Sequence, residues 1–296
     1  MSLSPYPTQD YVARFVLDTL PVHGRLVRLD AALNDILSAH DYPAPVANLL
    51  AEACVLAVLV GSALKFDGRL IMQAQGDGAV RYVVADYDTS GTLRGFCRFD
   101  PAELEALVSA NAQEFTLLGA RDLLGKGTFI MTLEPDNGGE RYQGVTPIEG
   151  ESLSLCAEYY FAQSEQVPTQ IKLAATQTDG RWRAGGAMIQ ALAGDDTRGD
   201  TTEAFDHVRA LFATLGEDEL TDFGLEAERL LYRLFHEDGV RLSPPKAVMR
   251  QCRCSQEKVE ELVRSFSAAD QADMIEADGK VHITCEYCST TYFIEP

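Results

Sequence analysis

The spacing of hydrophobic and polar residues changes several times between residues 1 and 192. Short segments that alternate at every second residue predict strands, and longer segments with apolar residues three or four apart predict helices. The expected strands are residues 24–30, 69–76, 79–86, 92–99, 127–133, 141–145, 171–178 and 181–192. The expected helices are residues 31–38, a longer buried helix after residue 45, one that begins near residue 100 and one over residues 152–163. Strand pairs interrupted by helices, without a regular βαβ alternation, favour an α+β fold.

Two local signals refine this pattern. Asp179 and Gly180 separate two alternating segments, and this dipeptide is typical of a two-residue hairpin turn. Asp100, Pro101 and Glu103 together are typical of a capped helix N-terminus. Both signals agree with the elements that the periodicity predicts.

The most apolar segment of the chain is residues 46–63. It carries Asn48 and Glu52 and is short for a membrane span, so it predicts a buried helix of a globular fold. The opening residues lack a basic start followed by an apolar run, which argues against a secretory signal. We therefore expect a cytoplasmic protein.

Residues 193–243 differ in composition and predict a helical linker. A polar stretch with glycines opens it, and two apolar stripes at helical spacing follow. The other helix faces are acidic, so each stripe must be buried against another surface. The helices could be docked permanently, or the flanking glycines could let them detach. The stripe residues that are candidates for binding another protein are Phe205, Val208, Phe212, Leu231 and Phe235.

Four cysteines gather in residues 244–296, which we expect to form a small module. Cys252 and Cys254 form a C-x-C pair, and Cys285 and Cys288 form a C-x-x-C pair. Two such pairs can supply four thiolates to one tetrahedral Zn²⁺ ion, with an iron–sulfur cluster as the lesser alternative. The module has few other groups to bury, so a metal is expected to stabilise its fold, by about 10–16 kcal/mol in comparable zinc peptides.

The metal site could be a permanent staple or a redox switch. Many sites with four cysteines are structural, but their pairs are usually spaced C-x2–4-C, so a C-x-C pair is unusual. Lys246, Arg250, Arg253 and Lys258 are expected to favour the thiolate form of the first pair. Each cysteine pair is close enough in sequence to form its own disulfide. Such oxidation would remove the ligands, and the folding free energy would be lost with the metal.

The remaining cysteines and one histidine have simpler interpretations. Cys54, Cys97 and Cys156 lie in predicted core elements, where free cysteine is commonly buried. His282 could act as a ligand near Cys285, but four cysteines already complete a tetrahedral site.

The chain is strongly acidic, with a formal net charge of -20. Such a chain repels phosphate backbones and anionic membranes, which argues against a zinc-stabilised nucleic-acid or translation factor. In a cytoplasmic protein, the seven cysteines are expected to be free, metal-bound or redox-active rather than a disulfide framework.

Taken together, these motifs resemble the heat shock protein 33 family of bacterial redox-regulated holdase chaperones over nearly the whole chain. The spacing of the four C-terminal cysteines matches the family signature at each position. The segments that carry the resemblance are CRCSQEKVEELV, ITCEYC, YYFAQSEQVPT, RAGGAMIQAL, LKFDGRLIMQAQGDG and LRGF.

The resemblance implies an α+β core domain (residues 1–192), a helical linker (193–243) and a zinc-binding redox-switch domain (244–296). It implies a chaperone that is not an enzyme, uses no ATP, and is inactive when reduced with one Zn²⁺ on the four cysteines. Peroxide or hypochlorous acid with mild heat would form Cys252–Cys254 and Cys285–Cys288 disulfides and release zinc. The linker would then expose apolar surface to unfolding client proteins. The family also implies a homodimer when oxidised and transfer of clients to ATP-driven foldase chaperones.

The residues alone leave two other functions open. One is a thiol–disulfide oxidoreductase that uses Cys285 and Cys288, although no thioredoxin-like βαβ pattern surrounds them. The other is a constitutive, zinc-stapled interaction protein.

Overall fold

Two six-stranded sheets form the body of the protein in a computed structural model that describes residues 9–111, 118–192 and 201–295. Sheet A contains β1 (Tyr11–Leu17), β2 (Val22–Leu29), β8 (Thr169–Thr178), β9 (Arg181–Ala191), β10 (Val240–Leu242) and β11 (Lys246–Ala247). Sheet B contains β3 (Gly68–Gly76), β4 (Val80–Asp88), β5 (Thr92–Phe99), β6 (Gly127–Pro135), β7 (Tyr142–Pro147) and β12 (Met249–Arg250). The strand orders are β10-β1-β2-β9-β8, with β11 also on β1, and β12-β5-β4-β3-β6-β7.

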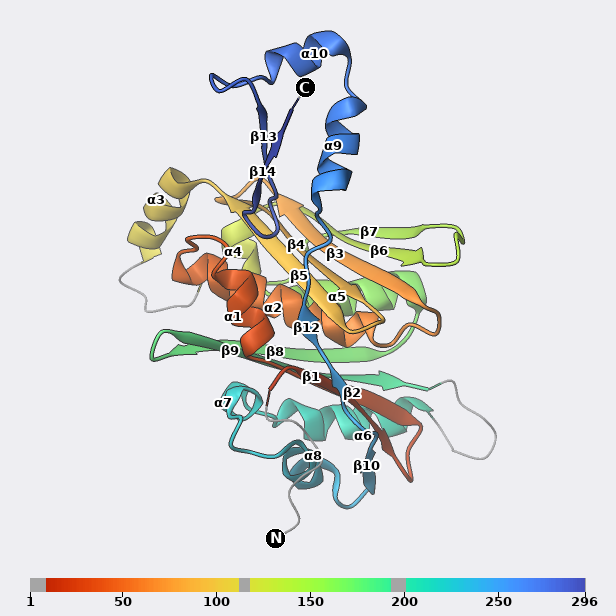
Figure 1. The fold of residues 1–296 in the computed structure, drawn as a ribbon. Helices are drawn as coiled ribbons and strands as arrows, with labels where there is room; N and C mark the ends of the chain where they lie inside the picture. The colour runs from red at the N-terminus through yellow and green to blue at the C-terminus, as the bar shows by residue number, and fades with distance from the viewer. Residues whose placement is uncertain (1–8, 112–117, 193–200, 296) are drawn as a thin grey trace.

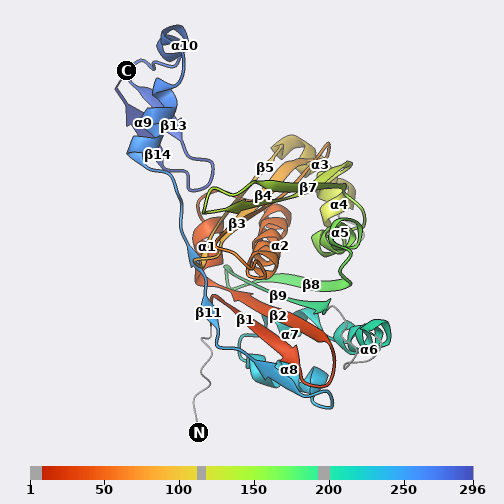
Figure 2. The ribbon, with the colours of Figure 1, turned by 90° about the vertical axis from the view of Figure 1, so that its right-hand side faces the viewer.

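Helices separate the two sheets and cover the far face of sheet A (Figures 1 and 2). The helices before residue 192 are α1 (Ala31–Leu37), α2 (Ala44–Gly61), α3 (Pro101–Asn111), α4 (Ala120–Leu124), α5 (Leu153–Tyr160) and the π-helical η1 (Phe161–Glu165). The later ones are α6 (Thr201–Ala213), α7 (Glu217–Thr221), α8 (Ala227–Phe235), α9 (Gln256–Arg264) and α10 (Ala268–Asp273). Figure 2 shows the order of layers as sheet B, the helices around α2, sheet A and then α6–α8.

The central helix α2 lies between the sheets because it is apolar on nearly every side. Among the described residues it is the one helix that is long and apolar enough to cross a membrane, and 78% of that window is buried inside the fold. Its side chains join residues of both sheets in one core cluster. The prediction of a buried helix here is therefore confirmed.

Several other local predictions are confirmed. β8 and β9 pair as an antiparallel hairpin, and Asp179 and Gly180 at its turn have φ angles of 52° and 75°. Asp100 Oδ1 accepts hydrogen bonds from the backbone N–H groups of Ala102 and Glu103, so it caps α3. The mixed helix-and-sheet architecture agrees with the predicted α+β class.

Some strands are absent from the sequence-based prediction. β1 has buried residues on both faces because sheet A has helices on both sides, so apart from the exposed Arg14 its residues do not alternate between apolar and polar. β10, β11 and β12 have two or three residues each and exist because they pair with β1 and β5. Strands this short are defined by distant partners rather than by their own pattern.

The helices α6, α7 and α8 form a layer on the outer face of sheet A (Figures 1 and 2). Their apolar residues form a second core cluster with β1, β2 and β9. Phe235 of α8 stacks on Phe15 of β1 with ring centroids 5.9 Å apart. Residues 193–200, where the predicted linker begins, lie outside the described residues.

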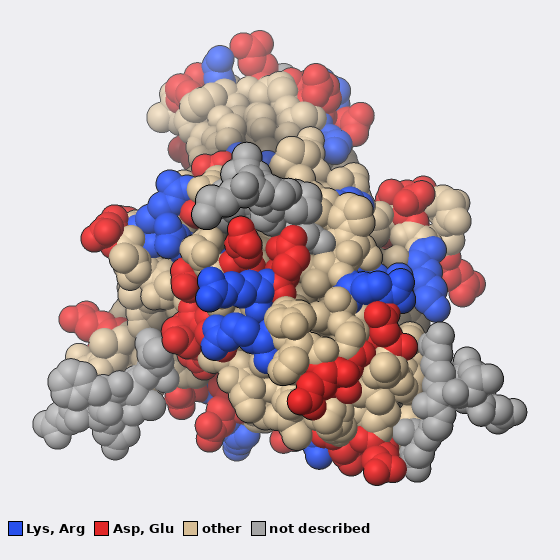
Figure 3. Space-filling model, turned by 90° about the horizontal axis from the view of Figure 1, so that it is seen from below, with Lys and Arg blue, Asp and Glu red and all other residues tan. Residues whose placement is uncertain are grey.

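The acidic character of the chain is visible on the side of this helical layer. Figure 3 shows acidic side chains spread over that face, with basic side chains in a few smaller groups. Such a surface is unsuited to a phosphate backbone, which agrees with the net charge of -20.

Candidate metal centre

The four clustered cysteines come from two loops of a small C-terminal module. Cys252 and Cys254 lie between β12 and α9, and Ser255 caps α9 by accepting a hydrogen bond from the Lys258 N–H. Cys285 and Cys288 lie in the turn between β13 (Val281–Thr284) and β14 (Thr291–Ile294), which pair as a two-stranded sheet. Backbone bonds within residues 285–290 hold this turn in a compact knuckle.

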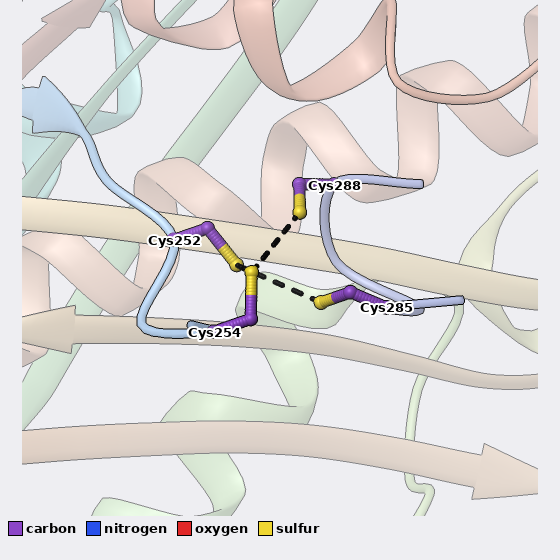
Figure 4. Close-up of side chains that lie close together, drawn as sticks. All are labelled: Cys252, Cys254, Cys285 and Cys288. Carbon is purple, nitrogen blue, oxygen red and sulfur yellow. Dashed lines mark hydrogen bonds between the residues drawn. The ribbon is translucent and has the colours of Figure 1, made fainter. Parts of the chain in front are cut away.

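The four sulfur atoms point toward one another (Figure 4) and lie within 4.8 Å of each other. The Cys252–Cys254, Cys254–Cys288 and Cys252–Cys285 sulfur distances are 3.2, 3.4 and 3.7 Å. A tetrahedral Zn²⁺ site with bonds of about 2.3 Å places its sulfur atoms about 3.8 Å apart. The donor set and its spacing therefore fit a thiolate-bound Zn²⁺ ion.

All four thiols are reduced, and their separations leave the disulfide pairing open. Cys254 lies almost as close to Cys288 as to Cys252. The geometry thus allows the Cys252–Cys254 disulfide but does not by itself select it over a Cys254–Cys288 bond.

Burial and hydrogen bonds shift the pKa values of Cys254, Cys285 and Cys288 in different directions. Burial alone would raise the pKa of Cys288, but hydrogen bonds with the hydroxyl and backbone of Thr290 and with Cys254 lower it to about 6. Burial raises the pKa of Cys285 to about 12. Burial and the neighbouring sulfurs also raise the pKa of Cys254, although the Tyr292 hydroxyl donates to this sulfur at 3.0 Å.

The basic residues near the first pair form bonds elsewhere. Arg253 pairs with Asp88 at 2.8 Å and lies 3.6 Å from Asp86. Lys258 donates to the Arg253 carbonyl at 3.0 Å, and Lys246 donates to the Thr89 carbonyl. At Cys254 the expected stabilisation of the thiolate is not found, because burial and the neighbouring sulfurs raise the pKa of this thiol.

The cysteine knuckle also contacts sheet B. The Tyr287 ring lies 4.1 Å from the Arg94 guanidinium and packs edge-on against Phe96, with ring centroids 4.6 Å apart. Arg94 is itself held by the buried Asp86 at 2.7 Å. The Glu286 carbonyl lies 2.7 Å from His40 Nε2 of the α1–α2 loop. The residues between the two ligands of the C-x-x-C pair thus form a contact that sequence reasoning missed, because its partners lie in distant strands.

Few apolar residues hold the module together. Its core cluster consists of Val259, Val263, Val281 and Ile294, with three partly buried neighbours. Such a core is too small to stabilise about forty residues alone, so the module fits the expectation of a metal-dependent fold.

The other cysteines and His282 lie away from the cluster. Cys54, Cys97 and Cys156 are free and buried, as expected, and burial raises the pKa of Cys54 to about 12 and that of Cys156 to about 11. Thiols with such high pKa values react slowly with oxidants. His282 lies 2.9 Å from Asp278 and packs against Phe293.

The candidate client-binding residues are all buried in the layer on sheet A. Phe205 is the most exposed of them at 7%, and the others are at 1% or less. The structure therefore brings Phe205, Val208, Phe212, Leu231 and Phe235 into one cluster that is closed to other proteins while α6–α8 are docked.

Comparisons with known proteins agree with this architecture. The family model described as Hsp33 protein matches residues 10–295. A 33 kDa chaperonin of Caulobacter vibrioides is 58% identical over 97% of this chain and 95% of its own length. One from Photorhabdus laumondii is 38% identical over 97% of this chain and 93% of its own length.

A solved structure shows the shared fold. The crystal structure of the 33 kDa chaperonin (heat shock protein 33 homolog) from Thermotoga maritima matches with a TM-score of 0.79 and 20% identity. The match covers 97% of this chain and 95% of that chain. The family model and the two relatives show more than a shared fold: the chain belongs to the Hsp33 family of 33 kDa chaperonins.

Proposed function

We propose that this chaperone is a redox-regulated, ATP-independent holdase that is inactive while reduced and bound to one Zn²⁺. The observation that carries the proposal is the cluster of four thiols. It directly follows the segment that contributes β10 and β11 to sheet A and β12 to sheet B. We also propose the division into a core (1–192), a helical linker (193–243) and a redox-switch domain (244–296). Residues 240–250 then connect the redox-switch domain to the core, because their strands pair with β1 and β5.

The redox step takes place on the cysteines. When bound, Zn²⁺ supplies a positive charge that holds four thiolates together and stabilises the small module. Peroxide takes two electrons from each thiolate pair: one S–S bond forms, the O–O bond breaks, and two hydroxide ions are released and take up protons. We assign the bonds Cys252–Cys254 and Cys285–Cys288, because each joins neighbours within a single loop.

Loss of the thiolates weakens each contact that links the module to the core. Arg253 and Tyr287 lose their fixed positions beside Asp88 and Arg94. β12 pairs with β5 through two residues only, so it detaches at low cost. β11 and β10, at the edge of sheet A, then hold the end of α8 less firmly.

Undocking of α6–α8 creates the client-binding surface. The layer covers buried residues of sheet A, among them Phe15, Leu26 and Ile189. Undocking exposes both this face and the stripe that contains Phe205, Val208, Phe212, Leu231 and Phe235. Contiguous apolar area of this kind binds other apolar surfaces, such as those of unfolding proteins.

The wider proposal follows the family resemblance. Partners are unfolded client proteins, a second copy of the chain in the oxidised state and ATP-driven foldase chaperones that receive clients. The location is the cytoplasm, and the protein is not an enzyme. The thiol–disulfide oxidoreductase is disfavoured because the two cysteine pairs converge on one site whose sulfur spacing fits a metal ion.

A paired assay on reduced, zinc-loaded protein tests this function. Peroxide is titrated at mild heat while a metallochromic dye reports zinc and light scattering reports aggregation of a thermally unfolding client. The expected result is release of about one zinc per chain, with client protection only after release. Zinc release without protection would identify the module as a structural staple, and turnover of insulin disulfides would favour the oxidoreductase.

A further inference from the structure

Arg28 of β2 is a buried cation on the outer face of sheet A, beneath the helical layer. It is 2% exposed. It is directly opposite Tyr11 of β1 and Gly185 of β9, and Tyr11 belongs to the core cluster that the layer covers. Because opposite residues of paired strands share one face of the sheet, Arg28 points toward α6–α8 rather than toward α2.

The chain around the α7–α8 connection covers Arg28 with backbone carbonyl groups. Arg28 Nη1 donates to the Leu225 carbonyl at 2.6 Å, and Nη2 lies 3.4 Å from the Glu219 carbonyl. Its Nε atom is buried without a hydrogen-bond partner, and no ion pair joins Arg28 to a carboxylate, in the part of the chain that the structure describes. Two carbonyl groups compensate a buried guanidinium only in part, since a buried charge needs full hydrogen bonding and a counter-charge.

Phe223 of the same connection contacts two guanidinium groups. Its ring centroid lies 5.3 Å from Arg28 Cζ and 5.5 Å from Arg183 Cζ, within the range of cation–π attraction. Arg183 of β9 lies 3.8 Å from one oxygen of Asp30, and the other oxygen of that carboxylate pairs with Arg181. One aromatic ring therefore sits against two arginines that share little other negative charge.

The residue before Phe223 adds that charge. Burial lowers the pKa of Arg28, and the Asp222 carboxylate opposes this effect by stabilising the charged guanidinium. Gly185 allows the chain to come so close, because a Cβ atom at this position would lie 2.2 Å from the Leu220 carbonyl oxygen. The strand thus offers a glycine floor and two guanidinium groups, and its occupant offers backbone carbonyls, a carboxylate and an aromatic ring.

We propose that, once α6–α8 undock, the site formed by Arg28, Arg183 and Gly185 binds client segments in which an aromatic residue adjoins an acidic one. This inference rests on the proposed function, because the site opens only when the layer leaves. In the closed state Asp222 and Phe223 occupy the site and show the chemistry that fits it. A client of the same chemistry replaces the acceptors and the ring that the two arginines lose on undocking, so sheet A selects clients by charge as well as by apolar area.

Peptide binding to full-length, peroxide-oxidised, zinc-released protein tests the site. The probes are three fluorescent peptides followed by anisotropy: one with the sequence of residues 216–227, one with Asp222→Lys and one with Phe223→Leu. Relative to the first peptide, we expect Kd to rise about tenfold or more with the lysine and about threefold or more with the leucine. The reduced, zinc-loaded protein should bind none of the three, because its own connection occupies the site.

Three variants of the oxidised protein locate the effect. Arg28→Met should abolish the preference for aspartate over lysine, and Arg183→Met should reduce the preference for phenylalanine over leucine. Arg14→Gln is the matched control: Arg14 is an exposed residue of β1, opposite Arg25 of β2, and it alternates with the β1 residues that face the layer. It should keep both preferences, because it lies on the other face of the same sheet.

Light scattering of a thermally unfolding client on the same oxidised samples separates this inference from the proposed function. Client protection with equal Kd values for the three peptides would overturn the inference alone, as would preferences that survive in both Arg28→Met and Arg183→Met. Absence of client protection would overturn the proposed function and this inference with it. If Arg28→Met fails to fold, Arg183→Met decides the question, because the Arg183 side chain is 45% exposed and its loss is easily tolerated.

Discussion

Replacement of Phe235 by alanine should release the helical layer without touching the metal site. Phe235 is fully buried on α8 and stacks on Phe15 of sheet A, 5.9 Å between centroids. Its helix α8 lies at the opposite end of the molecule from the cysteine module (Figure 1), so Zn²⁺ binding should be retained. We expect the reduced, zinc-loaded Phe235→Ala variant to protect clients to a measurable extent.

The expected size follows from the packing. Loss of a buried phenylalanine side chain costs about 3–5 kcal/mol. If this cost falls on docking of α6–α8, the undocked population rises about 140-fold to 3700-fold, at 1.4 kcal/mol for each factor of ten. Tyr232→Ala provides the matched control, because Tyr232 is on the same helix but 63% exposed. Its docking should change little.

Two measurements on the same samples complete the test. Hydrogen exchange of residues 201–235 reports docking, and light scattering of a thermally unfolding client reports chaperone activity. Faster exchange without client protection in Phe235→Ala would refute the claim that this face binds clients. Unchanged exchange would refute the packing argument itself.

Three further predictions concern the cysteine module. Tyr287→Ala should keep zinc but weaken docking of the knuckle by about 1–3 kcal/mol, because it loses the cation–π and aromatic contacts, and it should therefore lower the peroxide dose that activates the protein. Phe293→Ala, at an exposed position on β14, is the control, and equal activating doses for the two variants would contradict this role. Cys288→Ser should lower the zinc content of purified protein, whereas Cys156→Ser should not, as measured by metal analysis; equal zinc in the two would remove Cys288 from the ligand set. A strong chelator under reducing conditions should accelerate hydrogen exchange of residues 252–294 while sheet B stays protected, because the apolar core of the module is small; a protected module without metal would disprove its metal dependence.

The features that could be predicted from sequence are those with a local signature. The Asp179-Gly180 turn and the Asp100 cap depend on a few adjacent residues, and the apolar run of α2 has one stable environment, the core. The cysteine cluster was predictable because two short-spaced thiol pairs have few uses besides a metal or a disulfide. The structure places all four sulfurs together.

The features that escaped prediction depend on residues far apart in the chain. β12 exists because it pairs with β5, and Arg253 meets Asp88 across 165 residues of sequence. The docking of Tyr287 on Arg94 and the opposed pair Arg14 and Arg25 have no local pattern. β1 was missed for a different reason, since a strand buried on both faces loses the alternation that marks a half-buried one.

The central claim is that oxidation of the cysteine module frees a helical layer on the opposite side of the molecule. Hydrogen exchange of peroxide-treated, zinc-released protein tests it most directly, with peptides from the module (252–294), the helical layer (201–235) and β1 (Tyr11–Leu17) followed together. The account predicts that the layer and the edge of β1 that pairs with β10 and β11 lose protection along with the module, while α2 stays protected. Client protection with exchange confined to residues 252–294 would contradict it.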